Sequence, residues 1–264
     1  MATREEMSTS FGAASRAYDA GRPEYPAESV AFLLAPIAGR PRIADVGAGT
    51  GKLLRSIRRV REVDAIAVYP DEGMLATLTA RTPGVDARVG TAEHLPLRAG
   101  SVDAVVLGQA WHWVDPIAAS REVGRVLRPG GVLGLIWNVR DERVDWVHEL
   151  THILHGSSAE EMIASGVIPL HEPFEHLEEH VVEWERDMSR DDIEAMVRSR
   201  SYFITADERD QMRMMGDVFA LLDRLAVTGE STIAMPYVTK AFRATRPEVP
   251  TSALPGDGSV PEAT

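Results

Sequence analysis

A run of glycines behind a single acid is the feature of this sequence with the most chemical content. Residues 45–53 read DVGAGTGKL, after a strand-like segment and before a helix-like one. Gly47, Gly49 and Gly51 permit a tight turn and a close approach of the backbone to a ligand. The helix that follows offers free N–H groups at its N-terminus. Asp45 supplies a carboxylate that can pair with an ammonium group, directly or through water, so the turn predicts a ligand site.

The spacing of the glycines indicates which ligand the turn suits. A dinucleotide fingerprint reads G-x-G-x-x-G, whereas this turn reads G-x-G-x-G with an acid two residues before its first glycine. Such a turn suits the amino-acid part of a ligand better than a pyrophosphate. A nicotinamide-dependent oxidoreductase is therefore disfavoured. A helix N-terminus with turn glycines and no ligand is the structural alternative.

A histidine between two tryptophans follows the fourth predicted strand, in AWHWVD at 110–115. His112 is the best-placed candidate for a general base, which a hydroxyl, amine or carbon nucleophile can need and a carboxylate does not. The alternative is that His112 only lines the pocket or caps a backbone group. We expect one of Trp111 and Trp113 to pack in the core and the other to form a pocket wall.

A second histidine pattern resembles a zinc site but lacks its context. His148, Glu149 and His152 fit the H-E-x-x-H pattern of zinc proteases. The extended motif then requires a glycine and a third histidine, and this sequence has His155 and Ser158 in those two places. We therefore predict no metal site.

Strand-like and helix-like segments alternate through the first half of the chain. Short apolar runs typical of buried strands lie at 42–46, 64–68, 86–90, 101–109 and 131–138, with helical spacing at 27–37, 52–60, 73–81 and 116–127. Apolar strands that alternate with helices predict a parallel sheet covered on both faces.

The rhythm changes after Asn138. A helix at 145–156 precedes a long predicted strand at 176–188, and a last strand is predicted at 231–245. Two capping boxes, Ser189 with Asp192 and Thr205 with Glu208, predict the starts of two further helices. The proline-rich stretch 246–264 has little apolar content and is expected to be a disordered tail.

Composition limits the classes of partner. The 264 residues carry a net charge of −12, which disfavours nucleic acid and anionic membranes. No apolar run is long enough to span a membrane, and the N-terminus lacks the apolar stretch of a secretory signal. The chain has no cysteine, so a thiolate nucleophile and disulfides are excluded. We expect a cytoplasmic protein that is a monomer or a homodimer.

Four segments taken together resemble the class I S-adenosylmethionine-dependent methyltransferases. They are the glycine turn at 45–53, RVGTAEHLPLRAGSVDAVVLGQAWHWVD at 88–115, EVGRVLRPGGVLGLI at 122–136 and FGAASRAYDAGRPEYP at 11–26. The last is similar to the N-terminal lid of a small-molecule branch that includes trans-aconitate and type 11 methyltransferases. The resemblance is strong over residues 11–140, and beyond them only the order of elements matches.

The resemblance implies an α/β, Rossmann-like fold, with a seven-stranded, mostly parallel sheet, a reversed last strand and helices on both faces. It divides the chain into a lid segment (1–26), a core that binds S-adenosylmethionine (27–140), a C-terminal completion with variable substrate-side helices (141–245) and the tail. The implied cofactor residues are Asp45, Gly47, Ala48, Gly49, Gly51, Tyr69, Pro70, Met74, Ala92, Glu93, Gln109 and Ala110. The implied substrate residues are Tyr18, Arg22, Tyr25, Trp111, His112 and Asn138.

Three positions depart from the family pattern: Ser15 replaces an alanine, Thr91 replaces an aspartate, and Tyr69 replaces the acid after the second strand. After the second strand the family reads (D/E)-P-S-x-x-M-L, and here Pro70, Met74 and Leu75 align without gaps, which leaves Tyr69 in place of the acid. Such an acid accepts hydrogen bonds from both ribose hydroxyls, worth about 1.5–3 kcal/mol each when charged. Two readings follow. The protein transfers methyl groups to a small carboxylate or hydroxyl compound, with S-adenosylhomocysteine as product, or it is a methyltransferase-like binding module with weakened or lost cofactor binding.

Overall fold

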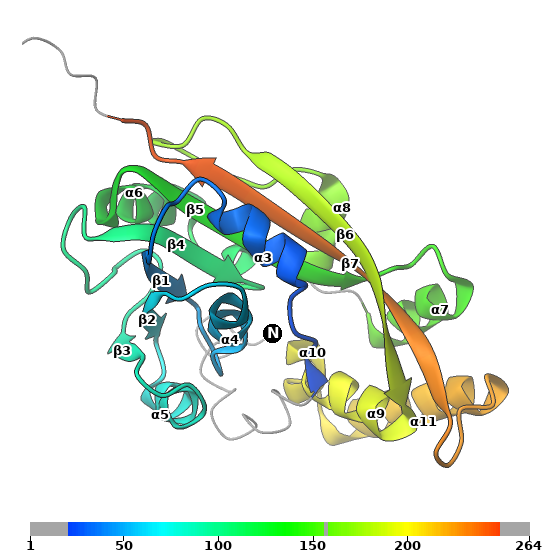
Figure 1. Ribbon diagram of the computed structural model, residues 1–264. Coiled ribbons are helices and arrows are strands. Elements are labelled where there is room, and N and C mark those ends of the chain that lie inside the picture. Colours follow the sequence, from blue (N-terminus) through cyan, green and yellow to red (C-terminus); the bar gives the residue numbers. More distant parts are fainter. Residues whose placement is uncertain (1–20, 156–157, 249–264) are drawn as a thin grey trace, which may run out of the picture.

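One sheet organises the protein. The computed structural model describes residues 21–155 and 158–248, and in them seven strands lie in the order β3-β2-β1-β4-β5-β7-β6 (Figure 1). The strands are β1 (Arg42–Val46), β2 (Asp64–Tyr69), β3 (Asp86–Val89), β4 (Val102–Gly108), β5 (Leu127–Arg140), β6 (Glu178–Ser189) and β7 (Thr232–Thr245). Strands β1 to β5 are parallel, and β7 is antiparallel to both β5 and β6. The predicted mostly parallel sheet with a reversed last strand is confirmed.

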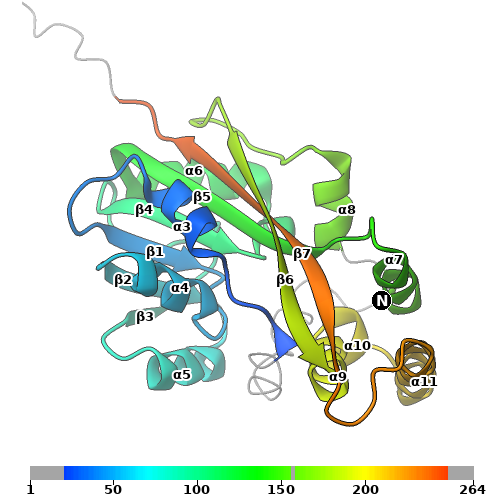
Figure 2. The same ribbon diagram turned by 45° about the vertical axis from the view of Figure 1, so that its right-hand side comes forward.

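Helices connect the strands and cover both faces of the sheet (Figure 2). They are α3 (Ala27–Leu34), α4 (Lys52–Val60), α5 (Glu72–Arg81), α6 (Pro116–Val126), α7 (Asp145–Leu154), α8 (Ser158–Ser165), α9 (Arg190–Arg198), α10 (Ser201–Ile204) and α11 (Glu208–Arg224), with a 3-10 turn η1 (Trp111–Trp113). Helix α8 has no counterpart among the sequence predictions.

Alternation along the buried strands divides the core into two layers. In β4, Val105 and Leu107 pack in the layer that holds α6, whereas Ala104 and Val106 pack in the layer that holds α3 and α4. Successive side chains of a strand point to opposite faces, so an uninterrupted apolar strand must be covered on both sides. Both layers are therefore consequences of the apolar runs in the sequence.

The C-terminal part of the sheet extends beyond the parallel strands. Strands β6 and β7 have 12 and 14 residues, and helices α9 to α11 lie between them in the sequence. A third apolar cluster fills this extension with residues of α7, α9, α11 and β7, including Val147, Met196, Leu221 and Tyr237. Gly21 lies against α9, because an added Cβ would come within 2.3 Å of the carbonyl oxygen of Ala195.

The start of α9 was predicted correctly and the start of α11 was not. Ser189 and Asp192 form the predicted capping box of α9. At α11 the N-cap is Asp207, whose side chain accepts a hydrogen bond from the backbone N–H of Asp210 over 2.8 Å. Thr205 lies before the helix, so the predicted box of Thr205 with Glu208 is wrong. A carboxylate is the stronger acceptor for the first free N–H groups of a helix.

The ends of the chain limit two predictions. Most of the predicted lid, Tyr18 included, and residues 249–264 of the predicted tail lie outside the described residues. Within 21–155 and 158–248, no helix combines the length and apolarity that crossing a membrane requires.

Candidate functional site

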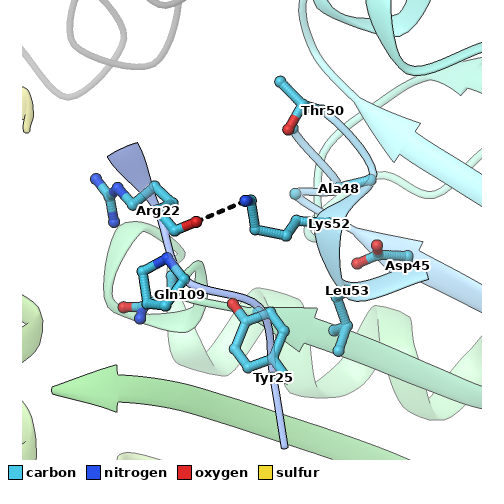
Figure 3. Close-up of a pocket in the computed structure, with 12 residues that line it drawn as sticks. Arg22, Tyr25, Asp45, Ala48, Thr50, Lys52, Leu53 and Gln109 are labelled. Carbon is cyan, nitrogen blue, oxygen red and sulfur yellow. Dashed lines mark hydrogen bonds between the residues drawn. The ribbon is translucent and has the colours of Figure 1, made fainter. Parts of the chain in front are cut away.

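A cavity lies where the carboxyl ends of β1 and β4 meet the glycine turn (Figure 3). Seven of the residues predicted for the cofactor and the substrate line it: Arg22, Tyr25, Asp45, Gly47, Ala48, Gly49 and Gln109. Open α/β sheets bind ligands outside the carboxyl ends of neighbouring strands. The structure therefore brings the turn, the end of β4 and the segment before α3 into one site.

Asp45 is the most unusual group in this cavity. Its side chain is 1% exposed, and neither carboxylate oxygen has a hydrogen-bond partner among the described residues. Burial raises the pKa of this carboxyl to about 8, and the nearby backbone N–H of Leu54 offsets only part of that rise. A buried carboxylate without partners is costly, so this group is poised for a ligand that brings a donor or a positive charge.

Each glycine of the turn is required for its own structural reason. Gly47 has a φ of 71°, and a Cβ there would lie 2.7 Å from the Cβ of Ala110 in the loop after β4. Gly49 has a φ of 52° with open space around it, and Gly51 caps α4 with a φ of 81°. Only glycine adopts these positive φ values without strain, so the turn holds its shape against β4.

Tyr25 and Lys52 close the cavity from the other side. A Cβ on Gly108 would come within 2.7 Å of the hydroxyl oxygen of Tyr25, so the phenol lies directly over the end of β4. Lys52 Nζ donates a hydrogen bond to the carbonyl oxygen of Arg22 over 2.5 Å (Figure 3). The sequence reasoning missed Lys52, although it is the first residue of the helix after the turn.

The end of β4 carries a strained residue. Gln109 has a φ of 57°, and its side-chain amide donates to the carbonyl oxygen of Asn138 over 2.8 Å. Left-handed backbone in a residue other than glycine is uncommon and clusters at functional sites. Asn138 is 4% exposed and is held by Thr239 and by the carbonyl oxygen of Glu24. Asn138 therefore supports the cavity from behind, and its predicted contact with substrate is not reproduced.

The end of β2, where the ribose of the cofactor is predicted to bind, carries Tyr69 in place of a carboxylate. Tyr69 ends β2 and is half-buried against the layer of α3 and α4. The nearest acid in sequence, Asp71, is the N-cap of α5 and accepts from the backbone N–H of Met74 over 2.7 Å. Met74 itself is 1% exposed, and Pro70 is exposed. Glu72, the next acid along the chain, lies exposed in the first turn of α5.

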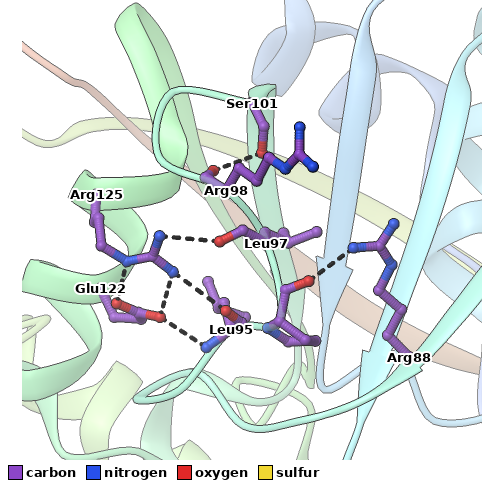
Figure 4. A network of polar contacts seen from close by, with 8 residues as sticks. Arg88, Leu95, Leu97, Arg98, Ser101, Glu122 and Arg125 are labelled. Atoms are coloured by element: carbon purple, nitrogen blue, oxygen red, sulfur yellow. Dashed lines mark hydrogen bonds and ion pairs between the residues drawn. The ribbon is translucent and has the colours of Figure 1, made fainter.

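The loop after β3 is held rigidly by ionic contacts (Figure 4). Glu122 accepts from the backbone N–H of Leu95 over 2.8 Å, while Arg125 donates to the carbonyl oxygens of Leu95 and Leu97. The bidentate contact with Arg125 lowers the pKa of Glu122. Arg88 reaches the same loop through the carbonyl oxygen of Pro96 at 2.7 Å. The loop is thus fixed before any ligand binds.

Two predicted adenine residues lie in this loop. Ala92 is 3% exposed and packs in the layer of α6. Glu93 accepts a hydrogen bond from the backbone N–H of Asp115 over 2.9 Å, so one oxygen of its carboxylate is engaged just before α6. The loop lies beside the predicted adenine end, but neither side chain lines the cavity at the glycine turn.

The tryptophan-flanked histidine is oriented by the core. Trp111 is 1% exposed, and its indole N–H donates to the carbonyl oxygen of Pro169 over 2.8 Å, so it is the core tryptophan and its predicted role at the substrate is wrong. Trp137 Nε1 donates to His112 Nδ1 over 3.4 Å. An Nδ1 that accepts places the proton of the neutral ring on Nε2. Nδ1 of His112 is therefore directed at the core, and the general-base role of this residue stays a prediction.

Comparisons with known proteins agree with this architecture. Residues 44–135 match the family described as methyltransferase domain. An uncharacterised methyltransferase of Mycobacterium tuberculosis is 46% identical over 244 residues, which cover 92% of this chain and 98% of that protein. The chain belongs to the S-adenosylmethionine-dependent methyltransferases. This membership replaces the nicotinamide-dependent alternative.

Solved structures share the fold of the methyltransferase. A chain from Anaeromyxobacter dehalogenans, provisionally named a type II methyltransferase, is 24% identical with a TM-score of 0.69, covering 86% of this chain and 99% of that one. Phosphoethanolamine N-methyltransferase 2 of Haemonchus contortus, in complex with phosphomonomethylethanolamine and S-adenosylhomocysteine, is 15% identical with a TM-score of 0.52, covering 94% and 61%. At these identities the likeness concerns the fold.

A wider hollow adjoins the cavity of the methyltransferase. It measures about 450 Å³ and is lined by Arg22, Pro23, Glu24, Tyr25, Pro26, Lys52, Trp184 and Arg186. The lining holds three basic side chains, Arg22, Lys52 and Arg186, and one acid, Glu24. Glu24 pairs with Arg59 at 3.0 Å, and Arg186 pairs with Asp192 at 3.6 Å. The hollow shares Arg22, Tyr25 and Lys52 with the cavity, so the two lie side by side.

The H-E-x-x-H pattern lies on α7, away from these residues. His148 is close to Glu142, and Glu149 pairs with Arg224 of α11. The rings of His148 and His152 are 5.5 Å apart. In the part of the chain that the structure describes, no three histidine, aspartate or glutamate side chains gather in a way that could hold a metal ion.

Proposed function

We propose that the protein transfers the methyl group of S-adenosylmethionine to a small acceptor, with a carboxylate as the preferred nucleophile. The observation that carries the proposal is the buried, partnerless carboxylate of Asp45 beside the glycine turn. A cation beside this acid would stabilise its ionised form, and the ammonium group at the cofactor's amino-acid end would be such a cation. Bound S-adenosylmethionine supplies an activated methyl sulfonium.

The residues present fit the cofactor better at one end than at the other. Asp45 would hold the amino group, and Gly49, whose surroundings are open, leaves room for the methionine chain against the backbone. At the ribose end Tyr69 offers one hydroxyl in place of a carboxylate, with Asp71 already used as a helix cap. We therefore infer that the amino-acid end provides most of the affinity and that Tyr69 lowers the affinity for the ribose.

Two observations support a carboxylate as the nucleophile. Displacement at a sulfonium needs positioning and exclusion of water, and only a protonated nucleophile needs a base. Trp137 Nε1 donates to His112 Nδ1 at 3.4 Å, so this ring nitrogen is engaged with the core and is not directed at a substrate. In the lining of the neighbouring hollow, the basic residues Arg22, Lys52 and Arg186 outnumber the one acid, Glu24, and this excess favours an anionic acceptor there. A carboxylate is ionised at neutral pH, so it can attack without a base.

Calorimetric titration with S-adenosylhomocysteine tests the cofactor assignment. We expect the unaltered protein to bind it, and Asp45→Asn to bind at least tenfold more weakly because the amide carries no charge. Since ligand binding requires ionised Asp45, the affinity of the unaltered protein should rise roughly tenfold from pH 6.5 to pH 8. NADH serves as the control ligand and should not bind.

Each alternative has its own outcome in this titration. Equal affinities of Asp45→Asn and the unaltered protein would reject the role of Asp45. No binding of S-adenosylhomocysteine at any pH would favour the second candidate, a methyltransferase-like binding module, for which the absence of an acid at Tyr69 is the supporting observation. Binding that tracks the ionisation of Asp45 justifies a screen of small carboxylic acids for methyl ester formation.

A further inference from the structure

Three arginines gather next to the cavity, on the side of the C-terminal helices. This arginine cluster consists of Arg22, Arg140 at the end of β5 and Arg200 just after α9. Burial, followed by the charges of Arg22 and Arg140, lowers the pKa of Arg200. Arg22 Nη2 lies 3.5 Å from the carbonyl oxygen of Ser199, the neighbour of Arg200. Figure 3 shows the guanidinium of Arg22 turned away from Lys52. Arg22 thus links the cofactor cavity to the cluster.

Two buried arginines of the cluster differ in their partners. The side chain of Arg140 is 1% exposed, and it forms an ion pair with Glu160 at 2.8 Å and a hydrogen bond to Thr151 at 3.3 Å. Arg200 is 8% exposed, yet its Nε has no hydrogen-bond partner, and no carboxylate in the described part of the chain forms an ion pair with it. A buried charge is normally paired, so Arg200 lacks a counterion.

A second unsatisfied group lies beside Arg200. The hydroxyl of Tyr202 is buried without a hydrogen-bond partner among the described residues. Burial raises the pKa of this phenol, so it stays protonated and can donate. The carboxylate whose charge is felt by Arg200 is that of Glu160. Glu160 already forms an ion pair with Arg140. Arg200 Nε and the Tyr202 hydroxyl are therefore two buried donors without a hydrogen-bond partner among the described residues.

We propose that Arg200 and Tyr202 bind an anionic group of the methyl acceptor, a carboxylate or a phosphate. The inference rests on the proposed function, because Arg22 lines the hollow assigned to the acceptor and also borders Arg200. Guanidinium and hydroxyl donors match the oxygens of such a group. Oxygens held this way have their lone pairs engaged, so the anchored group is distinct from the atom that receives the methyl group.

Anion titrations of the full chain test this site. Inorganic phosphate and succinate are titrated, by calorimetry and by thermal melting, into the unaltered protein, Arg200→Met and the control Arg198→Met. Arg198 is an exposed arginine of α9 that pairs with Glu194. We expect saturable binding of at least one probe, weakened at least tenfold in Arg200→Met and changed less than twofold in Arg198→Met. The tighter probe indicates whether the acceptor carries phosphate or carboxylate.

Stability gives an independent readout. Because Arg200 lacks a counterion, Arg200→Met should melt at a higher temperature than the unaltered protein in buffer without the probe anions, and the probe should remove that difference. Tyr202→Phe keeps the ring and should weaken anion binding about threefold to tenfold. If Arg200→Met does not fold, the result with Tyr202→Phe decides.

Two results would overturn the proposal. One is unchanged anion affinity in Arg200→Met or, where that variant does not fold, in Tyr202→Phe. The other is the absence of any anion effect on the unaltered protein. Titration of the same samples with S-adenosylhomocysteine separates the two proposals: its affinity should be unchanged in Arg200→Met. If no sample binds S-adenosylhomocysteine and anion binding is intact, the proposed cofactor site is rejected and the anion site is not.

Discussion

Asp45 and Arg200 are both buried ionisable groups that have no counterion among the described residues, and they respond to burial in different ways. Burial raises the pKa of Asp45 to about 8, and burial with like-charged neighbours lowers the pKa of Arg200 to about 10. At neutral pH Asp45 is therefore mostly protonated, whereas Arg200 stays charged. A carboxyl can release its charge by taking up a proton, and a guanidinium cannot do so at physiological pH.

The difference separates two ways of keeping a binding site ready. The cofactor end holds a neutral acid, which ionises when a cationic ligand arrives. The proposed acceptor end holds a permanent charge, which only an anion relieves. Binding at the first site should therefore depend on pH, and binding at the second should depend on the anions present.

The pH dependence of stability tests the behaviour of Asp45 and carries the largest expected effect. The native state keeps this proton up to about pH 8, and the unfolded chain releases it near the ordinary value of 3.8. Between these values the native state binds more protons, so its stability falls as the pH rises. We expect this group to remove roughly 5 kcal/mol from the free energy of unfolding between pH 4 and pH 8.

The comparison with Asp45→Asn isolates this contribution, because an amide does not titrate. Other carboxyls, such as Glu122 and Asp192, have lowered pKa values and change stability in the opposite direction. Urea denaturation of both proteins over this range should give a difference in the free energy of unfolding that grows with pH. A difference that stays constant would mean that Asp45 is ionised in the native protein.

The substitution Glu160→Gln removes the counterion of a second buried arginine, Arg140. This change leaves Arg140 charged and without an ion pair among the described residues, and loss of one partner of a buried pair is strongly destabilising. We expect a loss of about 3 kcal/mol in urea denaturation. The matched control is Glu194→Gln, which removes the exposed partner of Arg198 and should cost less than about 0.5 kcal/mol. Equal losses in the two variants would contradict the distinction between buried and exposed arginines.

Tyr69→Glu restores an acid at the ribose end and has the smallest expected effect. A charged acceptor for the ribose hydroxyls should tighten S-adenosylhomocysteine by about tenfold, or about 1.4 kcal/mol. Tyr69→Phe should change the affinity less than twofold if the phenol makes no bond to the ligand. Calorimetric titration measures both. Unchanged affinity in Tyr69→Glu would show that the ribose lies beyond reach of this strand end.

Elements that depend on periodicity were predictable from the sequence. Helix α4 has the predicted bounds, 52–60, and the strand at 42–46 is unchanged, because apolar spacing and glycine turns define both locally. The glycine turn and Gln109 meet in one cavity because parallel strands end at the same edge of the sheet. These predictions needed no knowledge of the contacts between distant residues.

Side chains whose partners are distant in sequence were less predictable. Trp111 is buried because Pro169, in a segment without a recognisable pattern, accepts its indole proton. Glu93 meets the backbone of Asp115 and not the cavity. Arg200 gave no signal, because Arg198 two residues earlier is exposed and the same residue type stands at both positions. Only the folded structure shows that one of them lacks a counterion.

The bond between Lys52 and the carbonyl oxygen of Arg22 has a practical consequence. The chain contains two lysines, Lys52 and Lys240, and no cysteine. Lys240 pairs with Glu179 on the outer strands, over 3.3 Å. Acylation by an amine-selective reagent, followed by mass spectrometry, would therefore give one labelled peptide that contains Lys52, from the cavity, and one that contains Lys240. The Lys240 peptide serves as the internal standard. The extent of acylation at Lys52, relative to Lys240, would report whether the segment around Arg22 is in contact with Lys52.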